Sequence, residues 1–163
     1  MKRIVIFGNS GSGKSTYAKN LSSSLGCSHM DLDTVAWESG VATPIRRSLE
    51  ASQSEILEFI NSEKNWVVEG CYADLLEVAL THATEIIFLN PGAKTCVDNA
   101  QNRPWEPHKY SSPEAQDANI GMLIEWIKEY DRRKDEFSYM AHRCLFESFV
   151  GQKREFNSNE RDG

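Results

Sequence analysis

The sequence predicts an α/β protein with a parallel β-sheet flanked by helices, and three observations support this. Short apolar runs typical of buried strands recur at residues 3 to 7, 66 to 69 and 85 to 89. Stretches with helical spacing separate them, an alternation typical of parallel sheets. A glycine-rich segment, residues 8 to 16, follows the first run directly. The 163 residues, 40% hydrophobic, suffice for one well-cored domain and are too few for two, so we expect a single domain over residues 1–163.

The first half of the chain predicts two helices and three strands. The first strand and the glycine-rich segment lead into an amphipathic helix over residues 14 to 25. A weaker, shorter strand precedes Asp31. A helix over residues 45 to 61 is predicted from the spacing of its apolar residues, Leu49, Ile56, Leu57 and Ile60. The strand over residues 66 to 69 follows it.

The second half predicts a strand over residues 85 to 89, two helices and a last strand. Ser112-Pro113 is a typical helix start, and we expect this helix to continue to about Arg133. Its apolar residues are spaced for burial on one face: Ile120, Leu123, Ile124 and Ile127. A further helix over residues 138 to 149 stops near Gly151, and residues 153 to 156 form a short strand. The polar tail from residue 157 to 163 is expected to be loose.

Residues 8 to 16 read G-N-S-G-S-G-K-S-T and fit the phosphate-loop (Walker A) pattern G-x-x-x-x-G-K-[ST]. Glycines let the backbone curl so that successive N–H groups point at phosphate oxygens. Lys14 is expected to neutralise the transferring phosphates, and the Ser15 hydroxyl to ligate Mg²⁺. The alternative is a glycine turn without a ligand. The predicted nucleotide-binding residues are Gly8, Ser10, Gly11, Ser12, Gly13, Lys14, Ser15 and Thr16.

Acidic residues stand where two of the predicted strands finish. Asp31 and Asp33 follow the phosphate-loop helix, and Glu69 closes the strand that begins at Trp66. Ligands of open α/β sheets bind at the carboxyl ends of the strands, so these carboxylates should converge near the phosphate loop. Asp31 and Asp33 have an alternative reading as turn or helix-cap residues. Glu69 is costly to bury unless it serves a metal or a hydrogen-bond network.

Composition limits the partners and the compartment. A net charge of −6 and an isoelectric point of about 5.3 argue against a broad nucleic-acid surface and favour a small anionic substrate. The cysteines are scattered without a C-x-x-C pair, as expected of reduced thiols in the cytoplasm: Cys27, Cys71, Cys96 and Cys144. No window has membrane-spanning length and no signal-peptide pattern is present, so we expect a cytoplasmic protein without a membrane partner.

Companion motifs of other phosphate-loop proteins are absent. The sequence has no N-K-x-D guanine-reading motif and no L-S-G-G-Q signature, and the strand over residues 85 to 89 ends at Asn90 instead of an acidic residue. These absences disfavour GTPases, ABC proteins and ring ATPases.

The chain resembles the nucleoside monophosphate kinase and shikimate kinase superfamily over most of its length. Asp31-Leu32-Asp33 is similar to the D-x-D of shikimate kinases, and Glu69-Gly70 to the D-G of adenylate kinases. Arg103-Pro104 resembles the R-P of the shikimate kinase lid. More closely, residues 32 to 37 and 66 to 72 resemble adenylate kinase-related proteins labelled FlaR-like or topology modulation proteins. The chain lacks the G-G-G of shikimate kinases, the F-P-R of adenylate kinases and a four-ligand zinc pattern, so neither substrate is carried over.

This resemblance implies a three-layer P-loop NTPase fold with a five-stranded parallel sheet, an acceptor-binding helical region over about residues 34–64, and a mobile lid over about residues 103–113. The implied catalytic residues are Lys14, Asp33 and Arg103. The implied Mg²⁺ ligands are Ser15, Asp31 and Glu69. The implied substrate residues are Asp33, Trp37, Arg46, Arg47, Gly70 and Tyr72.

Several of these residues also have structural readings. Trp37 and Tyr72 are equally consistent with core aromatics, and the expected helical pair Arg46 and Arg47 with a solvated face. Arg103 and Lys109 are expected to reach the phosphates when the lid closes.

The expected activity is Mg²⁺-dependent transfer of the terminal phosphoryl group of ATP to a small-molecule acceptor, either a hydroxyl compound or a nucleotide-like phosphate. With a hydroxyl acceptor, Asp33 orients or deprotonates the hydroxyl; with a phosphate acceptor, Arg46 or Arg47 matters more. Two alternatives stay open: a regulatory nucleotide-binding protein related to DNA, and a kinase of a larger acceptor. The sequence leaves monomer and homodimer equally open.

Overall fold

The computed structural model describes residues 1–38 and 45–160. Five strands form one sheet in the order β2-β3-β1-β4-β5, and all four neighbouring pairs are parallel. The strands are β1 (Arg3–Gly8), β2 (Ser28–Asp31), β3 (Trp66–Gly70), β4 (Glu85–Leu89) and β5 (Gln152–Phe156). The predicted α/β fold with a five-stranded parallel sheet is confirmed.

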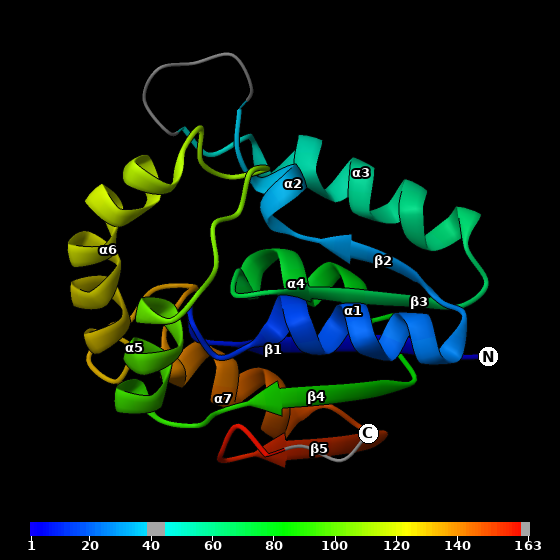
Figure 1. The fold of residues 1–163 in the computed structure, drawn as a ribbon. Helices are drawn as coiled ribbons and strands as arrows, with labels where there is room; N and C mark the ends of the chain where they lie inside the picture. The colour runs from blue at the N-terminus through cyan, green and yellow to red at the C-terminus, as the bar shows by residue number, and fades with distance from the viewer. Residues whose placement is uncertain (39–44, 161–163) are drawn as a thin grey trace.

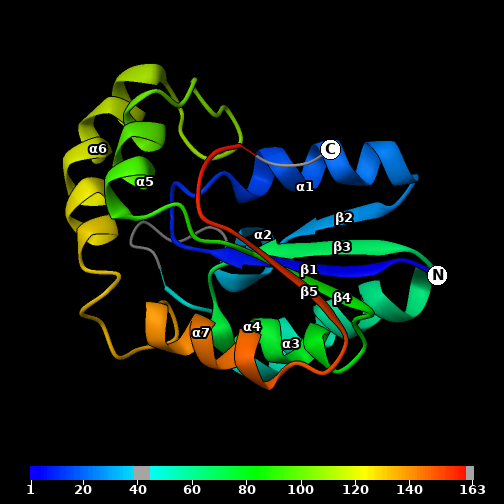
Figure 2. The same cartoon turned by 90° about the horizontal axis from the view of Figure 1, so that it is seen from below.

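Helices cover both faces of this sheet, and two more stand beyond the carboxyl ends of its strands (Figures 1 and 2). They are α1 (Lys14–Leu25), α2 (Asp33–Ala36), α3 (Leu49–Ser62), α4 (Ala73–Leu80), α5 (Ala93–Gln101), α6 (Pro113–Lys128) and α7 (Tyr139–Ser148). Figure 2 shows α1 on one face and α3, α4 and α7 on the other. Helices α5 and α6 stand beyond the carboxyl ends of the strands (Figure 1). Among the described residues, no helix is long and apolar enough to cross a membrane.

Strand β1 supplies both halves of the core because its side chains alternate between the two faces of the sheet. Ile4 and Ile6 pack with α1, whereas Val5 and Phe7 belong to the cluster built with α3, α4 and α7. All four side chains are at most 2% exposed. A strand buried on both faces is typical of a parallel sheet covered by two helical layers. This burial fixes the end of β1, and with it the start of the glycine-rich loop.

Two helix boundaries differ from the sequence expectation. Helix α3 begins at Leu49, not at residue 45, because the Ser48 hydroxyl caps it by accepting a hydrogen bond from the Ala51 backbone N–H. The expected placement of Arg46 and Arg47 on this helix is therefore wrong. They lie in the segment before it, where Arg46 forms an isolated antiparallel bridge with Trp37.

Helix α6 ends at Lys128 instead of about residue 133. The chain turns there so that Tyr130 is buried against the core, 4% exposed, with its hydroxyl 2.7 Å from Nδ1 of His142. Of the apolar residues expected on one face of α6, only Ile127 is fully buried, while Ile120 and Leu123 pack at the edge of the same cluster. The expected loose tail is only partly described; residues 157–160 lie against α5, where the side chains of Asn159 and Asn99 exchange hydrogen bonds of 2.9 Å.

His142 of α7 is buried in the core and connects three parts of the fold. Its Nε2–H donates to the Cys71 carbonyl at 2.8 Å, directly after β3, which leaves Nδ1 to accept from the Tyr130 hydroxyl. The ring also lies edge-on to Phe7 at 5.7 Å. Burial lowers the pKa of His142 to about 4, and the nearby charge of Lys14 acts in the same direction. The imidazole is therefore neutral and structural, as the absence of a nucleophile around it in the sequence also suggests.

We predict that His142 makes the protein less stable in mild acid. Its pKa is about 4 when folded and about 6.5 when unfolded, so the unfolded chain takes up the proton first. The free energy of unfolding should fall as the pH drops below 6.5, by about 3 kcal/mol at pH 4 from this group alone. Chemical denaturation of the wild type and of His142→Gln between pH 7 and 4 measures this. The variant should be less stable at pH 7 but show a flatter curve, and equal slopes would contradict the assignment.

Candidate active site

The glycine-rich loop leaves β1 and wraps the first turn of α1. Gly11 and Gly13 have φ angles of 79° and 91°, a left-handed conformation that side-chain-bearing residues rarely adopt. A Cβ atom on Gly11 would lie 2.4 Å from the backbone oxygen of Cys96 in α5. Glycine is therefore required at position 11 for two independent reasons, its dihedral angle and the close approach of α5. The loop leads directly into the first turn of α1, and the amino end of a helix suits a phosphate group.

Side chains from other elements hold this loop in place. The Asn99 amide of α5 donates to the Gly11 carbonyl at 2.9 Å, and the Asn9 amide donates to the Ile127 carbonyl of α6 at 3.2 Å. Lys14 folds back on the loop, with its Nζ donating to the Asn9 carbonyl at 2.8 Å. The ammonium group of Lys14 thus lies against the loop with a neutral partner, and its charge is available to an anion.

A carboxylate cluster lies next to the loop at the carboxyl ends of β2 and β3. Asp31 and Glu69 are direct neighbours in the β2–β3 register, and the Ser15 hydroxyl donates to Glu69 at 3.0 Å. His29 Nε2 lies 3.5 Å from the same oxygen of Glu69. Burial, followed by the negative charges of Glu69 and Asp33, raises the pKa of Asp31 to about 7. The structure thus brings the three predicted Mg²⁺ ligands, Ser15, Asp31 and Glu69, into one cluster.

This cluster fits a magnesium ion that is shared with a nucleotide. Hard oxygen donors are what Mg²⁺ prefers, and a cation would relieve the repulsion that raises the Asp31 pKa. Among residues 1–38 and 45–160, no group of three or more His, Cys, Asp or Glu side chains is arranged to hold a metal by itself. The protein would therefore supply only part of the coordination shell, with phosphate oxygens and water supplying the rest, as is usual for Mg²⁺.

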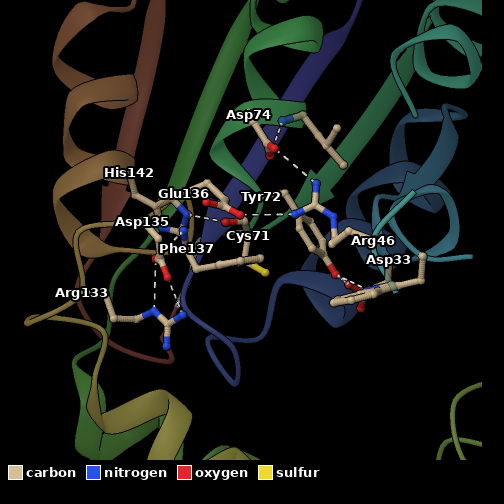
Figure 3. Close-up of polar contacts among 12 residues, drawn as sticks. Asp33, Arg46, Cys71, Tyr72, Asp74, Arg133, Asp135, Glu136, Phe137 and His142 are labelled. Atoms are coloured by element: carbon tan, nitrogen blue, oxygen red, sulfur yellow. Dashed lines mark hydrogen bonds and ion pairs between the residues drawn. The ribbon is translucent and has the colours of Figure 1, made fainter. Parts of the chain in front are cut away.

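Asp33 stands at the start of α2, two residues after Asp31. It accepts a short hydrogen bond from the Tyr72 hydroxyl (Figure 3). Its Oδ2 atom lies 3.0 Å from Nζ of Lys109. Burial alone would raise its pKa, but the charge of Lys109 and these two hydrogen bonds outweigh burial and lower it. The same interaction raises the pKa of Lys109 despite its own burial. Asp33 is therefore an ionised acceptor of hydrogen bonds.

The segment between α5 and α6, the predicted lid, crosses from α5 to the neighbourhood of α2 before it enters α6 (Figure 1). Its charged side chains pair with one another around Glu106. Arg103 Nε lies 3.1 Å from Glu106, and Lys109 lies 3.4 Å from it while also contacting Asp33. In this arrangement Lys109 connects the segment to Asp33, and Arg103 forms an ion pair within the segment. The contact of Arg103 with the phosphates stays a prediction.

Aromatic side chains line the site beyond Asp33. Trp37 donates from Nε1 to the Tyr72 hydroxyl at 2.9 Å, with the two rings edge to face at 6.3 Å. The Arg46 guanidinium lies over the Tyr72 ring at 4.9 Å (Figure 3). Arg47 is directed elsewhere: it pairs with Glu55 of α3 at 2.6 Å. The geometry thus separates the two arginines that the sequence treated alike.

Cys71, between Gly70 and Tyr72, lines the same space but is not a nucleophile. Burial raises the pKa of its thiol to about 12, so it stays protonated at neutral pH.

One cavity of about 1820 Å³ connects the loop, the carboxylates, the aromatic wall and the predicted lid. It exceeds the roughly 300–1,000 Å³ of a typical single-ligand pocket, so it has room for two substrates. The predicted site residues that line it are Ser10, Gly11, Gly13, Lys14, Ser15, Thr16, Asp31, Asp33, Trp37, Arg46, Glu69, Gly70, Tyr72 and Arg103. The predicted residues that do not line it are Gly8, Ser12 and Arg47. Gly8 and Ser12 are buried behind the loop surface. Part of the expected acceptor region, residues 39–44, lies outside the described residues.

Sequence reasoning missed several residues of this site. Asn99 and Asn9 anchor the loop through backbone carbonyls, and Asp74 and Glu136 pair with Arg46. Nothing in their local sequence marks them, because each partner lies at least 28 residues away. The link between Asp33 and Lys109 was also unforeseen, since Lys109 was expected at the phosphates.

The chain is similar in sequence to proteins with phosphate loops. A family model described as "AAA domain" matches residues 4–121. A protein of Pyrococcus furiosus named "Putative adenylate kinase" is 30% identical over 132 residues, covering 78% of this chain and 70% of that protein. A protein of Pyrococcus abyssi with the same name is 26% identical over 131 residues, with the same coverage.

Solved structures share the fold. A shikimate kinase from Bacteroides thetaiotaomicron superposes with a TM-score of 0.54 at 19% identity, over 99% of this chain and 89% of that one. A deoxyadenosine kinase from M. mycoides, solved with bound dATP, superposes with a TM-score of 0.51 at 15% identity, over 99% and 93% of the two chains. At these identities the similarity concerns the fold. The closer resemblance to FlaR-like proteins is tested by none of these relatives and stays a prediction.

We predict that alanine at Gly11 damages the loop more than alanine at a glycine with only a dihedral constraint. Gly26, at the end of α1, has a φ of 67° but nothing within 4 Å of an added Cβ, so Gly26→Ala should cost about 1 kcal/mol of stability. Gly11→Ala adds the clash with Cys96 and should also weaken nucleotide binding by at least roughly tenfold. Thermal unfolding and calorimetric titration with Mg²⁺-ATP measure both effects. Equal losses in the two variants would contradict the role of the α5 contact.

Proposed function

Because the chain belongs to the family described as AAA domain, within the P-loop small-molecule kinase superfamily, we propose that it transfers the terminal phosphoryl group of ATP to a small acceptor. The observation that carries this proposal is the single cavity that joins the Lys14 loop to a second compartment around Asp33. A protein that only binds a nucleotide needs the first compartment alone, whereas a transferase needs both substrates side by side. The names of the two Pyrococcus relatives point the same way.

In this proposal the loop holds the triphosphate, and Lys14 lies close to its terminal phosphates. To reach them, the Lys14 ammonium group leaves the Asn9 carbonyl to which it donates without a nucleotide. Ser15, Asp31 and Glu69 hold the Mg²⁺ side of the nucleotide, directly or through water. When bound, the metal ion would neutralise charge on the phosphate oxygens. A positive ion here also explains why a buried carboxylate cluster is tolerated next to the loop.

The proposed transfer proceeds in line. The acceptor oxygen forms a bond to the terminal phosphorus of ATP while the bond from that phosphorus to the bridging oxygen breaks, which releases ADP. The proton of a hydroxyl acceptor passes to Asp33 or, late in the transfer, to water. The lowered pKa of Asp33 makes it a weak base, which favours orientation of the hydroxyl over early deprotonation.

The segment over residues 103–113 completes the site as a lid in this proposal. For Arg103 to stabilise the transferring group, it must leave Glu106 and turn to the phosphates. We assign the acceptor-binding region to residues 34–64 and treat residues 1–163 as one kinase domain in the cytoplasm. Whether it works as a monomer or a homodimer does not enter the mechanism.

The experiment that tests the proposal is an ADP-release assay with purified protein, Mg²⁺-ATP and a panel of nucleosides, nucleoside monophosphates, shikimate and sugar acids. A kinase releases ADP in proportion to the acceptor added, above an acceptor-free control. Tight ATP binding with no stimulation by any acceptor would instead favour the regulatory nucleotide-binding protein. Repeating the assay with EDTA tests the metal requirement, and release that survives chelation would remove Mg²⁺ from the proposal.

We predict that Lys14→Ala abolishes acceptor-dependent ADP release by at least about 10³-fold, because no other group replaces its charge on the transferring phosphates. The fold should survive, since among the described residues the Lys14 side chain hydrogen-bonds to the Asn9 carbonyl of the loop and forms no ion pair. Lys128→Ala is the matched control, because this lysine lies on the outer side of α6 beside Glu125. Circular dichroism and the assay measure the two properties. Retained turnover in Lys14→Ala would remove this residue from the mechanism.

We predict that Asp33→Asn separates the two kinds of acceptor. It should lower kcat/KM for a hydroxyl acceptor by roughly 10²- to 10⁴-fold, because the amide cannot accept the hydroxyl proton. A phosphate acceptor is already ionised and should lose far less. The comparison of kcat/KM for both acceptors in the same variant is insensitive to any general loss of folded protein. Equal losses for both would contradict the assigned role.

A further inference from the structure

The acceptor compartment carries positive side chains, but carboxylates already neutralise each of them. Arg46 lies between two: its Nη2 is 3.3 Å from Asp74 and its Nη1 is 3.4 Å from Glu136, as Figure 3 shows. The guanidinium also lies over the face of Tyr72 at 4.9 Å. An arginine that captures a substrate anion needs a free side of its fork. Here both terminal nitrogens face protein carboxylates.

The other cations near this compartment are occupied in the same way. Lys109 contacts both Asp33 and Glu106, and Arg103 contacts Glu106. Arg47, the second arginine expected to bind the acceptor, pairs with Glu55 and does not line the cavity. Among the described residues, three cations of the compartment (Arg46, Lys109 and Arg103) thus face four carboxylates: Asp33, Asp74, Glu106 and Glu136.

An anionic acceptor entering this space would have to displace at least one carboxylate and leave it without a partner in a partly buried site. Contacts between like charges and unpaired buried charges are strongly unfavourable. Their cost is enough to make the compartment select an uncharged acceptor over an anionic one. The nucleotide side differs, because within residues 1–38 and 45–160 the ammonium group of Lys14 has a neutral carbonyl as its partner and no carboxylate. The charge distribution therefore places the phosphate preference on one side of the cavity alone.

The walls of the acceptor compartment are planar and apolar. Trp37, Tyr72, Phe137 and Trp126 all line the cavity, and Trp37 is 37% exposed. Neighbouring rings contact edge to face, with Tyr72–Phe137 and Trp126–Phe137 centroid distances of 5.2 Å. Arg46 lies over Tyr72 and Arg133 over Trp126, so Trp37 is the ring that offers an exposed face on which a flat, uncharged body can stack. Asp33, ionised and hydrogen-bonded at the same wall, offers an acceptor for a hydroxyl group.

We propose that the acceptor is an uncharged alcohol with a planar body, of the nucleoside class, and not a nucleoside monophosphate or another anion. This inference rests on the proposed kinase function and narrows its acceptor. Asp33 would bind the hydroxyl that receives the phosphoryl group, the aromatic wall would bind the flat ring system, and the Arg46 pairs would exclude a phosphate.

The test compares each nucleoside with its own 5′-monophosphate, because the two members of a pair differ only in the phosphate. We expect kcat/KM for adenosine, cytidine or thymidine to exceed that of the matching monophosphate by at least about tenfold. Preference for the monophosphate would overturn the inference while leaving the kinase function intact. Preference for a cationic amino alcohol over every nucleoside would also overturn it.

Binding separates this inference from the proposed function. Calorimetric titration of nucleoside and monophosphate into protein loaded with a non-hydrolysable ATP analogue reads the acceptor compartment without turnover. Nucleoside binding without turnover supports the inference and counts against the kinase function. Absence of nucleoside binding overturns the inference even where another acceptor is phosphorylated.

A charge-release variant tests the reason for the selectivity. Glu136→Gln removes one of the two carboxylates from Arg46 and should shift the preference toward the monophosphate by about tenfold, the order expected for one unit of charge at a partly exposed site. Glu55→Gln is the matched control, because it releases Arg47, which does not line the cavity, and should change the ratio less than about twofold. Equal ratios in Glu136→Gln and wild type would overturn the charge argument.

Discussion

Mutual repulsion among carboxylates at one edge of the sheet is the constraint on which the rest of the site depends. The parallel register places Asp31 beside Glu69, and the chain that leaves β2 puts Asp33 two residues further on. Negative groups so close together, in partly buried positions, would destabilise the fold unless positive or hydrogen-bonding groups offset them. Different side chains stabilise different carboxylates, since Ser15 donates to Glu69 whereas Tyr72 and Lys109 contact Asp33. Asp31 accepts a hydrogen bond from the Asp33 backbone N–H, but burial and the charges of Glu69 and Asp33 outweigh it and raise its pKa.

This unequal stabilisation explains how one cavity can hold two chemically different halves. The half near the loop has the Lys14 charge, which faces a neutral carbonyl, beside carboxylates that can hold a metal ion, and it suits a triphosphate with its metal ion. In the half near Trp37, the charged side chains are paired with one another. Lys109 stands at the boundary and belongs to the segment that covers the cavity. Movement of that segment would therefore change the electrostatic environment of Asp33 together with access to it. Substrate binding and carboxylate activation are linked through a single side chain.

The local sequence pattern was sufficient to predict the strands of the sheet, but it did not predict the contacts on the acceptor side of the cavity. Strand β4 was predicted to the residue, because a fully apolar run between polar ends permits few other structures. The start of α3 was misplaced because Ile45 continues the apolar spacing, and the Ser48 cap that ends it was overlooked. The loop motif could be recognised from sequence alone, because its glycines, lysine and serine stand at fixed spacing along the chain. The partners of Arg46 were not, because contacts over 28 and 90 residues of chain leave no local trace.

Helix α6 is attached to the molecule along one side and at its carboxyl end. Its residues Ile120, Leu123 and Ile127 pack against Cys96 and Ala100 of α5. At its carboxyl end, the Ile127 carbonyl accepts from Asn9 of the glycine-rich loop, and Tyr130 just beyond is fixed to His142. At its amino end, the helix continues directly from the covering segment through the Ser112 cap. Asn99 of α5 also donates to the Gly11 carbonyl, so the two helices that flank residues 103–113 are both tied to the glycine-rich loop. Both ends of the covering segment are therefore anchored on the donor side, and its movement would open the acceptor entrance while the triphosphate loop stays in place.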